Sequence, residues 1–141
     1  MLVIIPLKLL TIEGYGTHLL IAVKINGKKA KLLVDTGASR TVFDINRISK
    51  LTGKKKFNKN QQLSTGLGTN SMQSHNTLLK KFELGKLKIE NFEAILLDLT
   101  HVNESYEKIG LGTIDGVLGG EILVNFKAVI DYGKKQLKLK A

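Results

Sequence analysis

Apolar and polar residues alternate along much of the chain, which is typical of β-strands with one buried face. The alternation predicts strands over Ile4–Ile12, Leu19–Ile25 and Lys28–Val34. A turn at Glu13–Gly16 separates the first two strands. Asn26-Gly27 joins the second and third as a tight hairpin, since both residue types tolerate a positive φ.

After residue 40 the apolar residues follow the spacing of one face of a helix, which predicts a short helix ending at Gly53. The apolar residues at this spacing are Val42, Phe43, Ile45, Ile48 and Leu51. Further strands are predicted at Thr77–Leu84, Lys86–Ile89, Phe92–Leu97 and in a hairpin of Phe126–Tyr132 with Gln136–Leu139. The polar segment Thr100–Leu111 is expected to leave the sheet and form a short helical turn. No repeat or Pro-rich linker is present, so we expect one mostly β domain over residues 1–141 with one or two short helices.

Composition agrees with an ordinary folded domain, since 43% of the 141 residues are hydrophobic and 24% are charged. The formal net charge of +10 raises the question of nucleic-acid binding. However, the positive residues are scattered and nearly all lysine, and the densest cluster, Lys54–Lys56, is typical of a solvated loop. A basic β-barrel that binds nucleic acid would carry exposed aromatic residues, and aromatic residues make up only 6% of this chain. We therefore expect no specific nucleic-acid partner.

Residue content argues against several other kinds of site. The chain has no cysteine, and its histidines, His18, His75 and His101, lack the spacing of metal ligands. We therefore expect no metal and no cofactor. The apolar segment Met1–Leu10 is too short to span a bilayer and has neither a basic leader nor a cleavage site. This pattern predicts a cytoplasmic protein with no membrane span.

The most informative segment is Leu32–Ser39, with the sequence Leu-Leu-Val-Asp-Thr-Gly-Ala-Ser. Three apolar residues place Asp35 at the end of a strand, where a carboxylate costs free energy unless donors surround it. Gly37 allows a tight turn with available backbone N–H groups, and the hydroxyls of Thr36 and Ser39 lie next to it in the sequence. Asp-Thr-Gly alone is a common turn, so the apolar residues before it and the Ala-Ser after it are what favour a catalytic role.

This octet resembles the active-site signature of the aspartic peptidases, hydrophobic-hydrophobic-Asp-Thr-Gly-Ala-Ser. A second segment, Gly116–Leu123, resembles the hydrophobic-hydrophobic-Gly element that lies behind the active-site loop in this family, followed by its short helix. In this element Val117 and Leu118 would support the loop, and Gly119 would permit close backbone approach. A strand followed by a glycine-rich helix start would show the same pattern, but the two segments occur in the order of the family.

A third segment, Leu63–Met72, is predicted to form two strand arms around the tip Gly66-Leu67-Gly68. The tip resembles the flap that closes over substrate in retroviral-type members, and it would bind substrate together with Ala38. A glycine tip has few packed side chains and changes its backbone angles at low cost. An ordinary hairpin explains the pattern equally well, and the segment lacks the aromatic residue of pepsin-like flaps.

The resemblance implies chemistry that needs two carboxylates sharing one proton. The chain has no second copy of the motif, because Asp115-Gly116 lacks the hydroxyl residue and Asp131-Tyr132-Gly133 has a bulky tyrosine in its place. A two-lobed enzyme would also need about twice this length. The resemblance therefore implies a retropepsin-like acid protease barrel that is active as a symmetric homodimer, with Asp35 from each subunit at the axis.

In such a dimer Asp35 would be the catalytic carboxylate, and Thr36 would hydrogen-bond across the axis. Gly37 would allow the backbone to approach the substrate, and Ser39 would orient the outer oxygen of Asp35. The partner molecules would be a second copy of the chain and a peptide or protein in an extended conformation. The alternative is a catalytically silent peptide-binding module of the same fold, which keeps Asp35 and cleaves nothing.

Overall fold

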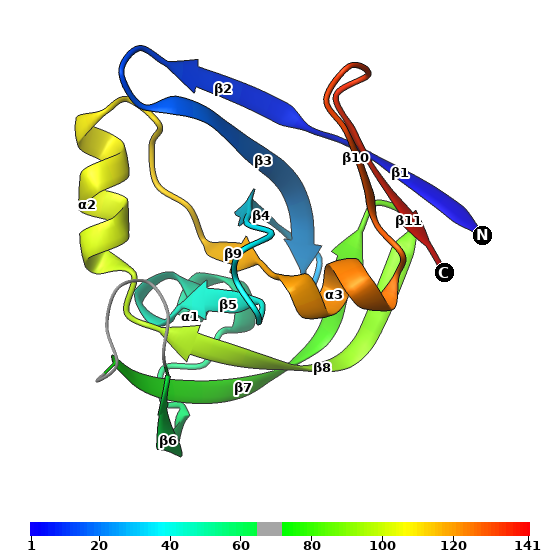
Figure 1. Ribbon diagram of the computed structural model, residues 1–141. Coiled ribbons are helices and arrows are strands. Elements are labelled where there is room, and N and C mark those ends of the chain that lie inside the picture. Colours follow the sequence, from blue (N-terminus) through cyan, green and yellow to red (C-terminus); the bar gives the residue numbers. More distant parts are fainter. Residues whose placement is uncertain (65–71) are drawn as a thin grey trace.

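The computed structural model describes residues 1–64 and 72–141, which form two β-sheets and three helices (Figure 1). The strands are β1 (Leu2–Pro6), β2 (Lys8–Ile12), β3 (Gly16–Ile25), β4 (Lys28–Val34), β5 (Val42–Asp44), β6 (Asn58–Ser64), β7 (Met72–Leu84), β8 (Leu87–Leu97), β9 (Gly116–Leu118), β10 (Val129–Asp131) and β11 (Gln136–Lys140). The helices are α1 (Ile45–Thr52), α2 (Thr100–Lys108) and α3 (Gly120–Asn125). The prediction of a mostly β fold is confirmed.

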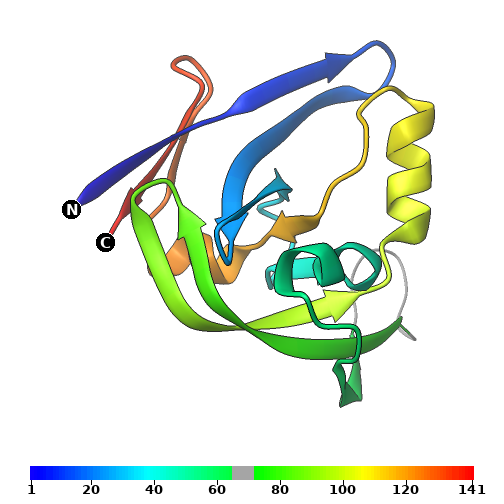
Figure 2. The ribbon, with the colours of Figure 1, turned by 180° about the vertical axis from the view of Figure 1, so that it is seen from behind.

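The larger sheet has the strand order β2-β3-β4-β9-β5-β8-β7-β6, and an additional pairing of β3 with β7 curls it back on itself (Figure 2). Near its centre, β9 pairs in parallel with β4 and antiparallel with β5. Leu32 lies opposite Gly116 and Val34 opposite Leu118. The strand that leads to Asp35 is therefore anchored to a strand from much later in the chain.

The smaller sheet has the order β1-β11-β10, so β10 is one of its edges. The two ends of the chain meet in this sheet (Figure 1), where the Met1 amino group donates to the Ala141 carbonyl at 2.7 Å. The outward face of β1 carries two exposed apolar side chains, Leu2 and Ile4. Part of the apolar surface of this sheet is thus left facing solvent.

Two apolar clusters hold the elements together, and β4 contributes to both. Leu32 and Val34 lie in the larger cluster, whereas Leu33 lies in the smaller one. Both faces of this strand are therefore buried, which explains why its end is a continuous apolar run rather than an alternating one. The smaller cluster also contains Leu99, Leu111, Ile114 and Val117 and lies beside the end of β4.

Several predicted elements are confirmed. The strand Lys28–Val34 has the predicted bounds, and the Asn26-Gly27 turn before it has φ angles of 50° and 82°. The hairpin near the carboxyl end is formed by β10 and β11. The polar excursion over Thr100–Leu111 contains α2.

The helix predicted after residue 40 begins later than expected. Val42 and Phe43 belong to β5, so their assignment to the helix was wrong. The helix begins at Ile45, because the side chain of Asp44 accepts a hydrogen bond from the N–H of Asn46 and caps the first turn. It ends as predicted at Gly53, which has a φ of 74°.

Two predictions also placed the boundaries between strands wrongly. The predicted strand Ile4–Ile12 is two strands in different sheets, because the chain pairs with β11 as far as Pro6 and with β3 from Lys8 onward. The predicted strands Lys86–Ile89 and Phe92–Leu97 are one continuous strand, β8, paired along its length with β7. None of the helices in the two described ranges has the length and hydropathy to cross a bilayer.

Candidate active site

Asp35 lies directly after β4, at the start of the connection to β5. Its N–H donates to the carbonyl of Leu118 at 3.0 Å, and its own carbonyl accepts from the N–H of Ala38 at 3.1 Å. The carboxylate oxygen Oδ1 accepts from the N–H of Gly37 at 2.9 Å. A Cβ at position 37 would lie 3.3 Å from that oxygen, so glycine keeps the contact uncrowded. The turn thus supplies the backbone donor that the sequence predicts.

The side chains around Asp35 leave its carboxylate accessible. Asp35 is half-buried, and Thr36 and Ser39 are exposed. Across residues 1–64 and 72–141, neither hydroxyl hydrogen-bonds to Asp35, and no Lys, Arg or His lies within ion-pair distance of it. The roles predicted for Thr36 and Ser39 therefore stay predictions, and both hydroxyls are free to meet another molecule.

Val117, Leu118 and Gly119 lie next to the Asp35 turn, and their role in supporting catalysis stays a prediction. Val117 and Leu118 are buried in β9, beside β4. A Cβ on Gly119 would lie 2.4 Å from the backbone carbon of Arg40, so only glycine lets the two segments approach this closely. The N–H of residue 120 donates to the Ala38 carbonyl at 2.7 Å, which ties the turn to the start of α3.

The predicted flap is described only in part. Gly66, Leu67 and Gly68 lie outside the described residues, so their contact with substrate stays a prediction. The strands that lead into and out of this segment, β6 and β7, pair antiparallel. Of the two predicted arms, only Leu63, Ser64 and Met72 lie within the described residues, in β6 and β7, so the arms around the tip stay a prediction.

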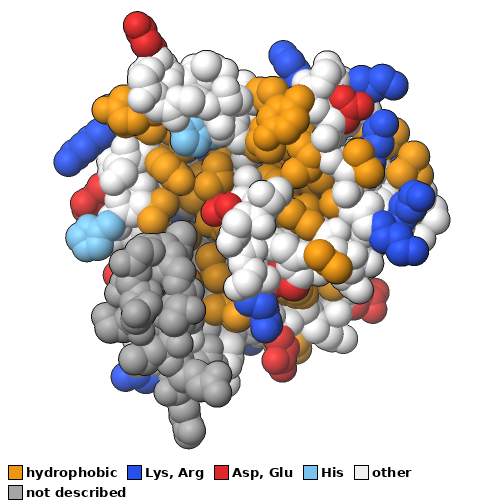
Figure 3. Space-filling model, viewed as in Figure 1, with side chains coloured by type: hydrophobic (Ala, Val, Ile, Leu, Met, Phe, Trp, Pro, Cys, Tyr) orange, Lys and Arg blue, Asp and Glu red, His pale blue; other side chains and the backbone are white. Residues whose placement is uncertain are grey.

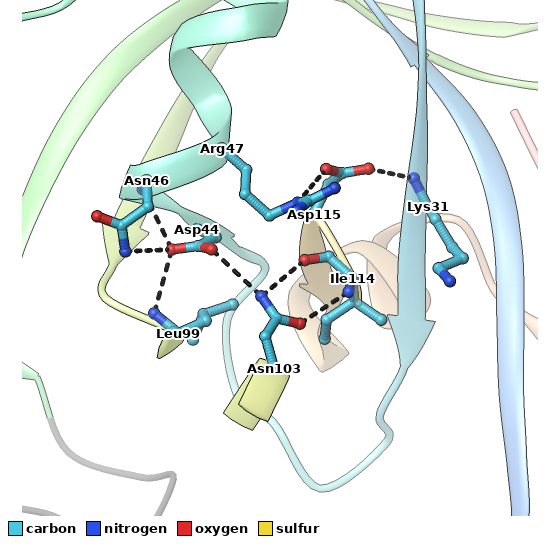
Figure 4. Close-up of polar contacts among 8 residues, drawn as sticks. All are labelled: Lys31, Asp44, Asn46, Arg47, Leu99, Asn103, Ile114 and Asp115. Atoms are coloured by element: carbon cyan, nitrogen blue, oxygen red, sulfur yellow. Dashed lines mark hydrogen bonds and ion pairs between the residues drawn. The ribbon is translucent and has the colours of Figure 1, made fainter. Parts of the chain in front are cut away.

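The structure contains a buried carboxylate, Asp44 of β5, that was not predicted from the sequence. Asp44 is 2% exposed, and the N–H groups of Asn46 and Leu99 donate to its Oδ1, each at 3.2 Å (Figure 4). The side-chain amide of Asn103 donates to Oδ2 at 3.2 Å and also exchanges hydrogen bonds with the backbone of Ile114. Asp44 thereby connects β5, α1 and α2 with the segment that enters β9.

Asp115 makes the next connection in the same network (Figure 4). Its carboxylate accepts from the backbone N–H of Lys31 at 2.8 Å and from the Arg47 Nε at 2.8 Å. Its own N–H donates to the Lys31 carbonyl. The carboxylate is therefore fully engaged in holding β4, α1 and β9 in register, which excludes it as a free partner for Asp35.

Helix α2 places an aromatic side chain near Asp35. The Tyr106 ring packs against the His18 ring in an edge-on arrangement with centroids 6.0 Å apart, and it covers the smaller apolar cluster. Burial raises the pKa of the Tyr106 hydroxyl above its usual value, and the negative charge of Asp35 raises it further. No sequence pattern pointed to Tyr106, because its proximity to Asp35 depends on how α2 packs.

We expect Asp35→Asn to lower the pKa of Tyr106 while leaving it above the usual tyrosine value, because only the charge contribution is lost. In the wild type the raised pKa means that stability falls as pH rises toward it, since the unfolded chain ionises first. The measurement is the ultraviolet absorbance of phenolate against pH, with Tyr106→Phe to identify the transition. Superimposable titrations of wild type and Asp35→Asn would contradict an electrostatic interaction between Tyr106 and Asp35.

Among the described residues, no group of three His, Asp or Glu side chains is arranged to hold a metal ion. The site therefore offers an accessible carboxylate on a turn held by hydrogen bonds, with two hydroxyl groups and the smaller apolar cluster next to it.

Comparison with known proteins relates this geometry to a family. A family model described as "Aspartyl protease" matches residues 21–122, a span that includes the Asp35 turn, β9 and the start of α3. No curated protein matches the chain.

Solved structures show the same fold. A retropepsin-like aspartic protease from Rickettsia conorii is 27% identical, with a TM-score of 0.58 over 99% of this chain and 89% of that one. The retroviral protease-like domain of Ddi1 from Leishmania major is 15% identical, with a TM-score of 0.59 over 86% of this chain and 87% of that one. The protease of EIAV, complexed with the inhibitor HBY-793, is 18% identical, with a TM-score of 0.52 over 79% of this chain and 90% of that one. The prediction of a retropepsin-like fold is confirmed.

Proposed function

The chain belongs to the aspartyl protease family, and we propose that it is an endopeptidase whose two Asp35 carboxylates, one from each subunit of a homodimer, activate water between them. The observation that supports this proposal most strongly is the environment of the Asp35 carboxylate. Its carboxylate is accessible, has no positively charged partner among the described residues, and stands on a turn fixed by hydrogen bonds to Leu118 and Ala38. A carboxylate held in this way is available for chemistry rather than for structure.

The second carboxylate has to come from another copy of the chain. The chain has five aspartates, and the other four are engaged by donors within the fold. Asp44 and Asp115 accept the hydrogen bonds of Figure 4, Asp98 accepts from Thr100, and Asp131 accepts from the N–H of Lys134. A symmetric dimer brings the same residue of each subunit to its axis, which supplies the missing group.

The proposed reaction then follows from two carboxylates about 3 Å apart, which cannot both be ionised and so share a proton. The ionised Asp35 takes a proton from water, whose oxygen attacks the carbonyl carbon of the peptide. The protonated Asp35 donates to the carbonyl oxygen and stabilises the tetrahedral intermediate. Breakdown of the C–N bond, with proton transfer to the leaving nitrogen, releases an amine and a carboxylic acid.

The remaining predicted site residues have consistent places in this proposal. Thr36 and Ser39 are exposed beside Asp35, so Thr36 can hydrogen-bond to the second copy and Ser39 can orient the outer oxygen. Ala38 and the tip residues 66–68 would bind an extended peptide by its backbone. The whole of residues 1–141 would then act as one domain, with one substrate cleft per dimer.

An apolar surface beside the Asp35 turn supports a partner at this position. Figure 3 shows apolar side chains gathered over the middle of the face that carries α3 and the connection from β4 to β5. Val124 on α3 is 79% exposed. Exposed apolar patches are typical of surfaces that pair with another chain.

A mixing experiment tests the proposal. Wild-type and Asp35→Asn protein are mixed at constant total concentration, under conditions that let dimers exchange subunits. We expect peptidase activity to fall more steeply than the fraction of wild-type protein in the mixture. With equal amounts, random pairing leaves about one quarter of the dimers with two aspartates, whereas independent active subunits would retain about one half of the activity. Activity that is proportional to the wild-type fraction would contradict a shared site. A protein that binds an extended peptide without any cleavage would support the silent binding module instead.

A further inference from the structure

A polar cluster outside the Asp-Thr-Gly motif joins the Asp35 turn to α3. Its central residue is Thr41, which is 1% exposed. The Thr41 hydroxyl accepts from the N–H of Gly119 at 2.9 Å and donates to Oε1 of Glu121 at 2.5 Å. The hydroxyl therefore uses both its donor and its acceptor capacity inside the protein, which fixes its orientation.

Glu121 accepts a second hydrogen bond from the same residue. Its Oε2 accepts from the backbone N–H of Thr41 at 2.5 Å, and its Oε1 also accepts from the N–H of Ile122 at 3.1 Å. The Arg40 Nε lies 3.4 Å from Oε2, on the more exposed side of the carboxylate. Each of the two carboxylate oxygens therefore receives one donor of Thr41, an arrangement that a neutral amide cannot reproduce because it has a single acceptor oxygen.

The backbones on either side of this cluster are in direct contact. A Cβ on Gly119 would lie 2.5 Å from the carbonyl oxygen of Arg40 and 2.8 Å from the Thr41 nitrogen. Hydrogen bonds from Asp35 to Leu118 and from residue 120 to Ala38 hold the earlier part of the turn against the same segment. The Asp35 turn is thus held at its beginning by the backbone alone and at its end by the Glu121 carboxylate.

We propose that Glu121 is a positioning residue, which acts through Thr41 and Arg40 to hold the Asp35 turn where the carboxylate of a second copy can meet it. This inference rests on the proposed function, because a dyad tolerates little displacement of either carboxylate. A misplacement of about 1 Å far from the reacting atoms can lower an enzyme's rate about 10²-fold. Glu121 itself touches neither substrate nor the reacting oxygens in this scheme.

The test compares Glu121→Gln with the wild type, and Glu107→Gln serves as the control that loses the same charge at an exposed position on α2. We expect Glu121→Gln to lower kcat about 10²-fold with KM changed by less than about 3-fold, because orientation is lost while the substrate surface remains. Thr41→Val, which lacks the hydroxyl, should lower kcat in the same way. Thr41→Ser, which keeps the hydroxyl, should retain activity near that of the wild type. A kcat of Glu121→Gln equal to that of Glu107→Gln would overturn the proposal.

A second measurement does not depend on catalysis. Amide hydrogen exchange of residues 35–41 should be about 10-fold faster or more in Glu121→Gln than in Glu107→Gln, because the end of the turn is released. Equal exchange in the two variants would overturn the positioning role even if activity were lost. Should wild type and Asp35→Asn both fail to cleave any peptide, the proposed function fails, and the exchange result still decides whether Glu121 holds the turn.

Discussion

Replacing Asp35 by asparagine is expected to lower kcat/KM for peptide hydrolysis by about 10⁴-fold, because the amide can neither take a proton from water nor share one with its symmetry mate. The substitution is nearly isosteric, and an asparagine Oδ1 still accepts the hydrogen bond that Gly37 donates at 2.9 Å. The fold should therefore survive, and the loss should be confined to the chemical step. Cleavage of a denatured protein or a peptide library, followed by mass spectrometry, measures the effect.

The matched control for this substitution is Asp131→Asn. Asp131 lies in the hairpin between β10 and β11, where its carboxylate accepts from the N–H of Lys134 at 2.9 Å. It carries the same side chain at the end of β10, outside the Asp35 site, so its substitution should leave activity near that of the wild type. Residual cleavage of equal rate in wild type and Asp35→Asn, insensitive to a pepstatin-type inhibitor, would show that the observed hydrolysis belongs to a contaminant.

Gly119→Ala is expected to destabilise the folded protein by about 3 kcal/mol and to abolish peptidase activity, since an added methyl group has no space. The new Cβ would lie 2.4 Å from the Arg40 carbon and 2.5 Å from its carbonyl oxygen, and both are backbone atoms that cannot rotate away. Relief requires the connection from Asp35 to β5 to move away from α3. Urea denaturation at a fixed protein concentration, followed by circular dichroism, gives the change in free energy of unfolding.

Gly120→Ala provides the comparison at the adjacent position. Its Cβ would lie 3.3 Å from the Ala38 carbonyl oxygen, which is tight but leaves room for a small adjustment. Alanine also favours the first turn of α3 more than glycine does. We expect a change in stability of less than about 1 kcal/mol and retained activity. A Gly119→Ala variant as stable as Gly120→Ala would show that the two segments are less closely packed than the structure indicates.

The sequence was sufficient to predict the part of the site that is continuous in the chain. The apolar run Leu32–Val34, followed by Asp35 and Gly37, contains both the buried strand and the turn that supplies a donor. The close approach at Gly119 was also predictable, because two glycines flanking an apolar pair permit backbone contact. These features are local, and each depends on the residue types next to one another.

Other parts of the site depend on residues that meet only in the folded chain. Thr41 and Glu121 are 80 residues apart, and Asp44 and Asn103 are 59 residues apart. No local pattern pairs a threonine with a distant glutamate, so both networks were missed. The misassigned residues Val42 and Phe43 have a related cause, since a three-residue strand is too short to show alternation and its pairing with β8 and β9 decides its structure.

The parallel pairing of β4 with β9 also has a consequence for biosynthesis. Its first contacts join residues 84 apart in the sequence, as in the hydrogen bond from Lys31 to Asp115, and closing so long a loop is slow compared with forming the β3–β4 hairpin. The Asp35 turn has its supporting strand only after residues beyond 118 have left the ribosome. A nascent chain therefore contains Asp35 before the strand that fixes the geometry of its turn has been made.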